Sequence, residues 1–237
     1  MKIAAFDLEI AKEIPNDVLD WQTISPLGIT CASVAHSDSE TPSVWQGVPQ
    51  MTREECRELV GGLQDLVSRG YVLVTWNGCS FDFAVLAEES GMVSECAELA
   101  MNHVDLMLIV TFTKGWFLGL QKALEGAKVE GKVKSVQLSD GSTLKGMHGS
   151  KAPALWERGE YEAVLTYLNG DVVQLLRLVE IIQRDAAISW ISGTGNRQRV
   201  AVKKLLTVRE CFDIPEPDVS WMDDPPTRQQ FIRWMEP

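Results

Sequence analysis

The sequence contains neither a long apolar run nor a closely spaced pair of cysteines. No stretch of its 237 residues approaches the roughly 18 consecutive apolar residues of a membrane-spanning helix. Residues 1–7, Met-Lys-Ile-Ala-Ala-Phe-Asp, are typical of a β-strand rather than of a signal peptide. Association with a membrane is therefore not expected.

The five cysteines are odd in number, widely spaced and free of any Cys-x-x-Cys pair. The pattern indicates neither a structural zinc site nor a disulfide framework, and it favours a reducing, cytoplasmic location. Histidine is also scarce. His36, His103 and His148 are scattered along the chain, and none of them is interpreted as a metal ligand.

Basic residues are outnumbered, with 22 Lys and Arg against 33 Asp and Glu and a net charge of −11. Such a charge argues against a general nucleic-acid-binding protein. The basic residues nevertheless gather in two stretches, although a solvated face without a ligand explains either stretch equally well. The two groups are Lys114, Lys122, Lys128, Lys132, Lys134, Lys145, Lys151 and Arg158, and Arg197, Arg199, Lys203, Lys204 and Arg209.

Two acidic residues stand at the end of the first predicted strand. Residues 2–8 are apolar on both faces, as in a central strand covered by helices. Because residues two apart along a strand point the same way, Asp7 and Glu9 share a face with Ile3 and Ala5. Sites in open α/β sheets gather at the carboxyl ends of strands, although a lone Asp-x-Glu there is usually solvated surface.

A third acid follows the strand predicted over residues 71–76. This strand breaks at an Asn-Gly dipeptide, a strong turn signal, and a helical pattern begins near Phe81. Ser80 suits the N-cap of this helix, which places Asp82 in its first turn, where a negative charge is favoured. An ordinary turn followed by a helix cap is the simplest alternative.

The last motif lies on a long helix predicted over residues 160–184. Tyr167 and Asp171 are four residues apart and project from one face of that helix, as in any half-exposed helix. Carboxylates gathered at one point repel one another unless divalent cations lie between them, which is the chemistry of a two-metal phosphodiester hydrolase. The four carboxylates that the motifs aim at one point are Asp7, Glu9, Asp82 and Asp171.

In order and spacing, these motifs resemble those of the DEDD superfamily of 3′–5′ exonucleases, which has the ribonuclease-H-like fold. The histidine subclass would have His five residues before the last Asp. That position is Thr166, so the tyrosine subclass (DEDDy) is the better match. Residues 103–106, His-Val-Asp-Leu, also resemble a segment of stand-alone relatives of polymerase proofreading domains. The matching residues are Asp7, Glu9, Asn77, Phe81, Asp82, Tyr167 and Asp171.

The resemblance implies two Mg²⁺ or Mn²⁺ ions and a role for each matching residue. Asp7 would bridge the two ions, and Asp82 would hold the second one. Glu9 and Asp171 would complete the site of the ion that activates the attacking water. Tyr167 would orient that water, because a hydroxyl with a pKa of about 10 is a poor base at neutral pH. The residues implied in substrate binding are Leu8, Asn77 and Phe81.

The predicted activity is removal of nucleotides from the 3′ end of single-stranded DNA, and the preference for DNA rests on the resemblance alone. One alternative is a 3′–5′ exoribonuclease of the same superfamily, which tolerates a 2′-hydroxyl. Another is a non-catalytic module with a vestigial site that binds nucleic acid or recruits a partner, although the intact set of acids argues against it. The last is chance occurrence of the motifs in an unrelated α/β protein.

Residues 1–190 are expected to form one α/β domain. It would contain a ribonuclease-H-like mixed central sheet flanked by helices, with a small β-hairpin insertion. Residues 191–237 would form a C-terminal extension that packs on the domain or binds a replication or repair partner. Further strands are predicted over residues 26–35 and 43–48, and further helices over residues 52–68, 94–101, 105–112 and 116–124.

The hairpin is predicted over residues 132–144, around a Ser-Asp-Gly-Ser turn signal. Because it carries lysines and directly precedes the third motif, we expect it to contact the nucleic-acid strand. A basic amphipathic helix is predicted over residues 200–211. Trp76 and Trp156 lie nearest to the predicted site in sequence and suit stacking on an unpaired base, although core packing is the simpler expectation.

Overall fold

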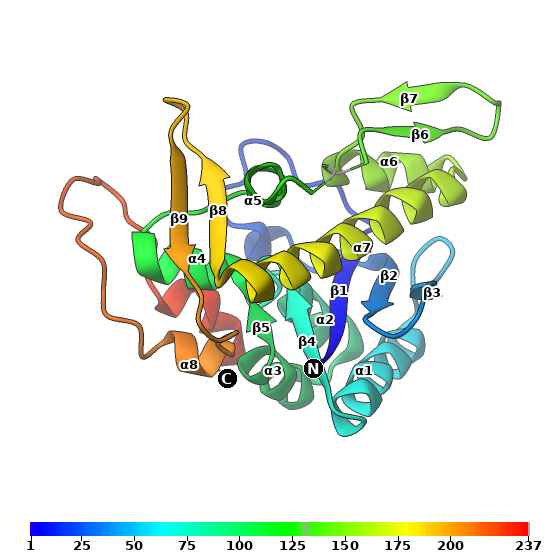
Figure 1. The fold of residues 1–237 in the computed structure, drawn as a ribbon. Helices are drawn as coiled ribbons and strands as arrows, with labels where there is room; N and C mark the ends of the chain where they lie inside the picture. Colours follow the sequence, from blue (N-terminus) through cyan, green and yellow to red (C-terminus); the bar gives the residue numbers. More distant parts are fainter. Residues whose placement is uncertain (130, 132, 237) are drawn as a thin grey trace.

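A five-stranded sheet forms the centre of the protein in a computed structural model that describes residues 1–129, 131 and 133–236. Its strand order is β3-β2-β1-β4-β5 (Figure 1). Because β1 runs antiparallel to β2 and parallel to β4, the sheet is mixed, which confirms the predicted α/β fold class. The strands are β1 (Lys2–Ile10), β2 (Ile29–His36), β3 (Ser43–Gln46), β4 (Tyr71–Thr75) and β5 (Val104–Asp105).

Helices cover both faces of this sheet because β1 is apolar on both (Figure 1). Ile3 and Ala5 pack in one hydrophobic cluster, with α4 and α7. Ala4 and Phe6 pack in the other, with α1, α2 and α3. Asp7 and Glu9 continue the row of Ile3 and are therefore directed toward α7. The helices are α1 (Arg53–Ser68), α2 (Asp82–Ser90), α3 (Val93–Asn102), α4 (Leu106–Lys114) and α7 (Tyr161–Asp185).

Helix α2 begins at Asp82, so this acid lies in the first helical turn as predicted, but the helix cap differs from the prediction. Phe81 occupies the cap position and makes no side-chain cap hydrogen bond, so the assignment of Ser80 as the N-cap is wrong. Ser80 Oγ instead donates a hydrogen bond of 2.7 Å to Asn77 Oδ1, because the tight turn after β4 brings these two side chains together.

A small hairpin stands apart from the central sheet, as predicted (Figure 1). β6 (Ser135–Gln137) pairs antiparallel with β7 (Thr143–Lys145). Lys132, the first residue of the predicted hairpin, lies outside the described residues. The elements around the hairpin are α5 (Leu120–Ala127), the 3-10 helix η2 (Gly149–Lys151) and α6 (Ala152–Glu157).

A second hairpin replaces the predicted basic helix after α7. β8 (Ala187–Ile191) pairs with β9 (Arg197–Ala201), and only α8 (Val208–Cys211) is helical in this region. The prediction of a helix over residues 200–211 is wrong because Val200 belongs to β9 and packs into the core that contains α7. The domain boundary predicted after residue 190 lies inside β8.

The end of the chain returns to the domain through two short 3-10 helices, η3 (Gln229–Phe231) and η4 (Arg233–Met235). Phe231 is buried in the cluster that contains α4. Trp234 Nε1 donates a hydrogen bond of 2.8 Å to Cys79 O, in the turn that precedes α2. The extension therefore contacts the turn that carries the second motif. Within the described residues, none of the helices is long and apolar enough to cross a membrane.

Candidate active site

Strand β1 carries Asp7 and Glu9 to the edge of the sheet at which β1 and the parallel strand β4 end. The pairing register between β1 and β2 shifts between Glu9 and Ile10, which marks a β-bulge. Beside it, Thr30 Oγ1 donates a hydrogen bond of 3.0 Å to Glu9 O. Bulges near active sites change the direction of side chains, so the direction of Glu9 depends on β2 as well as on its own strand.

A buried carboxylate, Asp105, holds the turn between β4 and α2. It accepts hydrogen bonds of 3.0 Å from Asn77 N and from Cys79 N, and two more from N–H groups at the start of α4. Burial raises the pKa of Asp105 to about 6, and the four backbone donors oppose that rise. Asn77 has φ 75°, a left-handed conformation that Asn adopts more readily than most residues.

Asp7 and Asp82 meet at one backbone N–H group. Leu8 N donates to Asp7 Oδ1 at 3.0 Å and to Asp82 Oδ1 at 3.2 Å. Burial raises the pKa of Asp82 well above its ordinary value, and the charge of Asp7 and a hydrogen bond with it raise that pKa further. Two neighbouring buried carboxylates are stable only when a proton or a cation offsets their charge.

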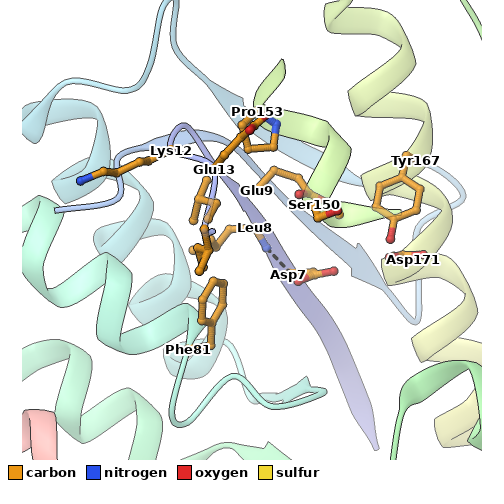
Figure 2. Close-up of a pocket in the computed structure, with 13 residues that line it drawn as sticks. Asp7, Leu8, Glu9, Lys12, Glu13, Phe81, Ser150, Pro153, Tyr167 and Asp171 are labelled. Carbon is orange, nitrogen blue, oxygen red and sulfur yellow. Dashed lines mark hydrogen bonds between the residues drawn. The ribbon is translucent and has the colours of Figure 1, made fainter. Parts of the chain in front are cut away.

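Helix α7 presents Tyr167 and Asp171 to β1, one helical turn apart (Figure 2). Ser33 Oγ of β2 donates a hydrogen bond of 2.7 Å to Asn169 Oδ1 and fixes the helix against the sheet. Gly170 lies where the segment before β6 passes close to α7, since a Cβ there would come within 2.3 Å of Val133 Cγ2. A side chain at position 170 would therefore require the Val133 side chain to move.

These elements enclose a pocket of about 290 Å³. In Figure 2, Asp7 and Glu9 lie on one side of the open space, and Tyr167 and Asp171 face them from α7. Asp82 is joined to the pocket through the N–H of Leu8. Asn77 is held in the turn and does not line the pocket. The predicted site residues that line it are Asp7, Leu8, Glu9, Phe81, Tyr167 and Asp171.

Sequence reasoning missed the remaining wall of the pocket. Gly149 lies beside Glu9, since a Cβ there would be 3.6 Å from Glu9 Oε2. No motif marks these residues, which lie just after β1 or in η2 and α6. The one local signal is Pro153 in the first turn of α6, typical of a helix start. The missed residues include Lys12, Glu13, Gly149, Ser150 and Pro153.

Three of the four acids of the site are buried, and Asp7 is partly buried. Exposed fractions are 6% for Glu9, 4% for Asp82 and 2% for Asp171. Their field also reaches Cys31 on β2: burial raises the pKa of this thiol, and the charges of Glu9 and Asp7 raise it further. Such concentration of negative charge in a buried site is costly unless the charges are compensated.

The donor set fits hard divalent cations such as Mg²⁺ or Mn²⁺, which prefer carboxylate oxygens. Two observations support this fit: Asp7 and Asp82 accept the same N–H, and the pKa of Asp82 is raised. A cation bound between the two carboxylates would offset their charge in place of a proton. In this arrangement, no three His, Cys, Asp or Glu side chains of the described residues form a closed metal site.

Comparison with known proteins identifies the class to which this fold and site belong. Residues 25–183, more than half of the chain, match the RNase_H superfamily, so the chain belongs to that superfamily, whose members are typically nucleases that use divalent metals. The match includes Asn77, Asp82, Tyr167 and Asp171 and begins after the first motif. No curated protein matches the chain.

The structure is similar to that of the family B DNA polymerase from the hyperthermophilic archaeon Pyrobaculum calidifontis. The TM-score is 0.55 at 19% sequence identity, over 76% of this chain and 24% of the polymerase. The chain therefore spans about a quarter of that polymerase. At this level of identity, the similarity establishes a shared fold.

Proposed function

We propose that this protein is a metal-dependent exonuclease that removes nucleotides from the 3′ end of single-stranded DNA. The observation that carries the proposal is the convergence of Asp7 and Glu9 with Tyr167 and Asp171 in one pocket, with Asp82 joined to it through Leu8 N. These residues come from three elements far apart in sequence, and their convergence within an RNase_H superfamily fold supports nuclease chemistry over chance occurrence of the motifs.

Four carboxylates, Asp7, Glu9, Asp82 and Asp171, are assigned as ligands of two divalent ions. The ions would lower the pKa of a bound water and stabilise charge on the entering and leaving oxygens. Asp7 and Asp82 already accept the same Leu8 N–H, so both carboxylates are placed to hold a cation. Burial of Glu9, Asp82 and Asp171 limits their contact with bulk water and would strengthen their hold on a cation.

Tyr167 is assigned to orient the attacking water. Its side chain is 2% exposed and lines the pocket beside Asp171, one turn away on α7. A phenol is a poor base near neutral pH but donates and accepts hydrogen bonds, so positioning is the role that its chemistry supports.

Leu8 and Phe81 are assigned to the terminal nucleotide. Both line the pocket, and the Phe81 ring is held edge-on to Trp21 at 5.4 Å. Apolar and aromatic side chains bind an unpaired base by stacking, and the enclosed site favours a frayed, single-stranded end. Lys134 and Lys145 on the β6–β7 hairpin are exposed, and we propose that they contact the phosphates of the entering strand.

The test is degradation of a 5′-labelled single-stranded DNA by wild-type protein and by Asp7→Asn, with Mg²⁺ or Mn²⁺ and with chelator. The expected result is a metal-dependent ladder that shortens from the 3′ end and disappears in the variant. Asp223→Asn is the matched control, because Asp223 is an exposed aspartate outside the pocket. An equal ladder from Asp7→Asn would refute the site assignment, and RNA run in parallel would show whether the exoribonuclease alternative holds.

A further inference from the structure

A second pocket, of about 450 Å³, lies between the C-terminal end of α4, the first turn of α5 and the β8–β9 hairpin. Its wall contains Lys114 and Lys122, which belong to the first basic group of the sequence and have no role in the catalytic pocket. Trp116, Trp190 and Gln198 also line it.

The charge of this pocket is opposite to that of the protein. Among the residues that the structure describes, no acidic side chain lines it, although the chain has a net charge of −11. Neither Lys114 nor Lys122 forms an ion pair with another described residue. Two ammonium groups that pair with no described acidic residue, beside one cavity, favour an anionic ligand.

Helix electrostatics explain only one of the two lysines. Lys114 lies in the last turn of α4, where the helix dipole stabilises a positive charge. Lys122 is the third residue of α5 (Leu120–Ala127), where the same dipole opposes it. Local helix stability therefore accounts for Lys114 but works against Lys122.

Aromatic rings lie beside these cations. Trp116 is only partly buried, and its ring meets that of Trp190 edge-on at 5.5 Å and 81°. Trp190 is 3% exposed and supports Trp116 from the core. A fixed, partly exposed indole next to lysines is the combination that binds single-stranded nucleic acid, because bases stack on the ring while phosphates contact the ammonium groups.

The pocket is connected to the catalytic edge of the sheet. Trp76 Nε1 donates a hydrogen bond of 3.1 Å to Leu118 O, which joins the 116–118 segment to the residue directly before Asn77. α5 lies between the second hairpin and α7, the helix that carries Tyr167 and Asp171 (Figure 1). A strand that leaves the catalytic pocket along α5 would therefore reach Lys122.

We propose that this pocket is a second subsite for single-stranded nucleic acid, which binds the strand on the 5′ side of the terminal nucleotides. Lys114 and Lys122 contact backbone phosphates, Trp116 stacks on a base, and the Gln198 amide hydrogen-bonds to a base or sugar. The inference rests on the proposed nuclease function and extends it, because it predicts that long strands bind more tightly than short ones.

The test measures binding of labelled oligothymidylates by fluorescence anisotropy in chelator, where no hydrolysis takes place. A dinucleotide is compared with a strand of about 12 nucleotides, which exceeds the reach of one pocket. For Lys122→Glu, the Kd of the long strand should rise about tenfold or more. In a plot of the logarithm of the association constant against the logarithm of salt concentration, the slope for the long strand should become shallower. The change should be about 0.7 for each phosphate contact that the variant loses. The Kd of the dinucleotide should not change.

Lys203→Glu is the matched control, because Lys203 is an exposed lysine outside this pocket and the change of charge is the same. Trp116→Phe keeps a stacking ring and should bind the long strand like wild type, whereas Trp116→Ala should weaken it about tenfold. Thermal melting verifies that each variant is folded. Oligouridylate replaces oligothymidylate in a parallel series and reports whether the subsite prefers DNA or RNA.

Two outcomes would overturn the subsite: a long-strand Kd unchanged in folded Lys122→Glu, or an equal loss in Lys203→Glu. Failure of the nuclease proposal looks different. In that case wild-type protein would hydrolyse neither the DNA nor the RNA strand with Mg²⁺ or Mn²⁺. Lys122→Glu would still lose affinity for the long strand. Conversely, a wild-type 3′ ladder together with unchanged long-strand binding in the variant would retain the nuclease and reject the subsite.

Discussion

Acid is expected to weaken the fold through His103, the buried histidine that follows α3. Its Nε2 lies 2.8 Å from Thr75 Oγ1, and its Nδ1 lies 2.6 Å from Ala100 O. Gly78 N donates to the same Thr75 Oγ1 at 3.0 Å. Neutral His103 with its proton on Nδ1 satisfies all three contacts, because Thr75 then donates to Nε2. The imidazole therefore supports the turn that precedes Asp82.

Burial lowers the pKa of His103 from 6.5 to about 4. The unfolded chain therefore binds a proton more readily than the folded protein between these two values. The stabilisation from neutral His103 is complete above pH 6.5 and is lost as the pH falls toward 4. At about 1.36 kcal/mol for each pKa unit, the loss over this window is about 3 kcal/mol.

The measurement is urea unfolding of wild type and His103→Gln in chelator at several pH values between 7.5 and 4. Comparison of the two proteins is needed because the pKa of Asp105 is raised to about 6 and the pKa of Asp82 is also raised. Relief of those buried charges stabilises the fold as the pH falls. The difference in unfolding free energy between the two proteins isolates His103, and it should shrink by about 3 kcal/mol from pH 7.5 to pH 4. A difference that stays constant would refute the assignment of a buried neutral imidazole.

Two further outcomes are expected. Asp82→Asn should raise the melting temperature in chelator, because it removes a carboxyl group whose ionisation is opposed by burial and by the charge of Asp7. It should also lower hydrolysis at least about a hundredfold. A lower melting temperature, measured by circular dichroism, would contradict the repulsion. Phe231→Ala should cost about 3–5 kcal/mol of unfolding free energy in a denaturant titration, because Phe231 is 1% exposed in the core. Trp221→Ala, at a 68% exposed position, is the control and should change stability by less than about 0.5 kcal/mol; equal effects would show that the extension does not anchor to the domain.

Local pattern in the sequence was sufficient where neighbouring residues determine the outcome. The period of two along β1 directs Asp7 to the face of Ile3, and the spacing of four on α7 places Tyr167 above Asp171. The capping box at the start of α1 formed because Thr52 and Glu55 are three residues apart and satisfy each other's backbone partners. The direction of side chains along one strand or helix, and the cap of one helix, depend on residues only two to four positions apart.

Predictions failed where a distant partner competed with a local preference. Ser80 bonds to Asn77 rather than capping α2, because Asp105 accepts the Asn77 and Cys79 N–H groups and shapes the turn. Val200 joins a strand rather than a helix, because β8 offers it a paired neighbour and a place in the core.

The sequence by itself determined the fold class, the elements that carry the three motifs and the acids on their faces. Only the tertiary structure decided that Asp7 and Asp82 share the Leu8 N–H, that a β-bulge follows Glu9, and that Gly149 lies beside Glu9 in the pocket. The physical reason is that these relations join residues far apart in the sequence. Their energies depend on the packing of complete elements, and no local pattern of residues records that packing.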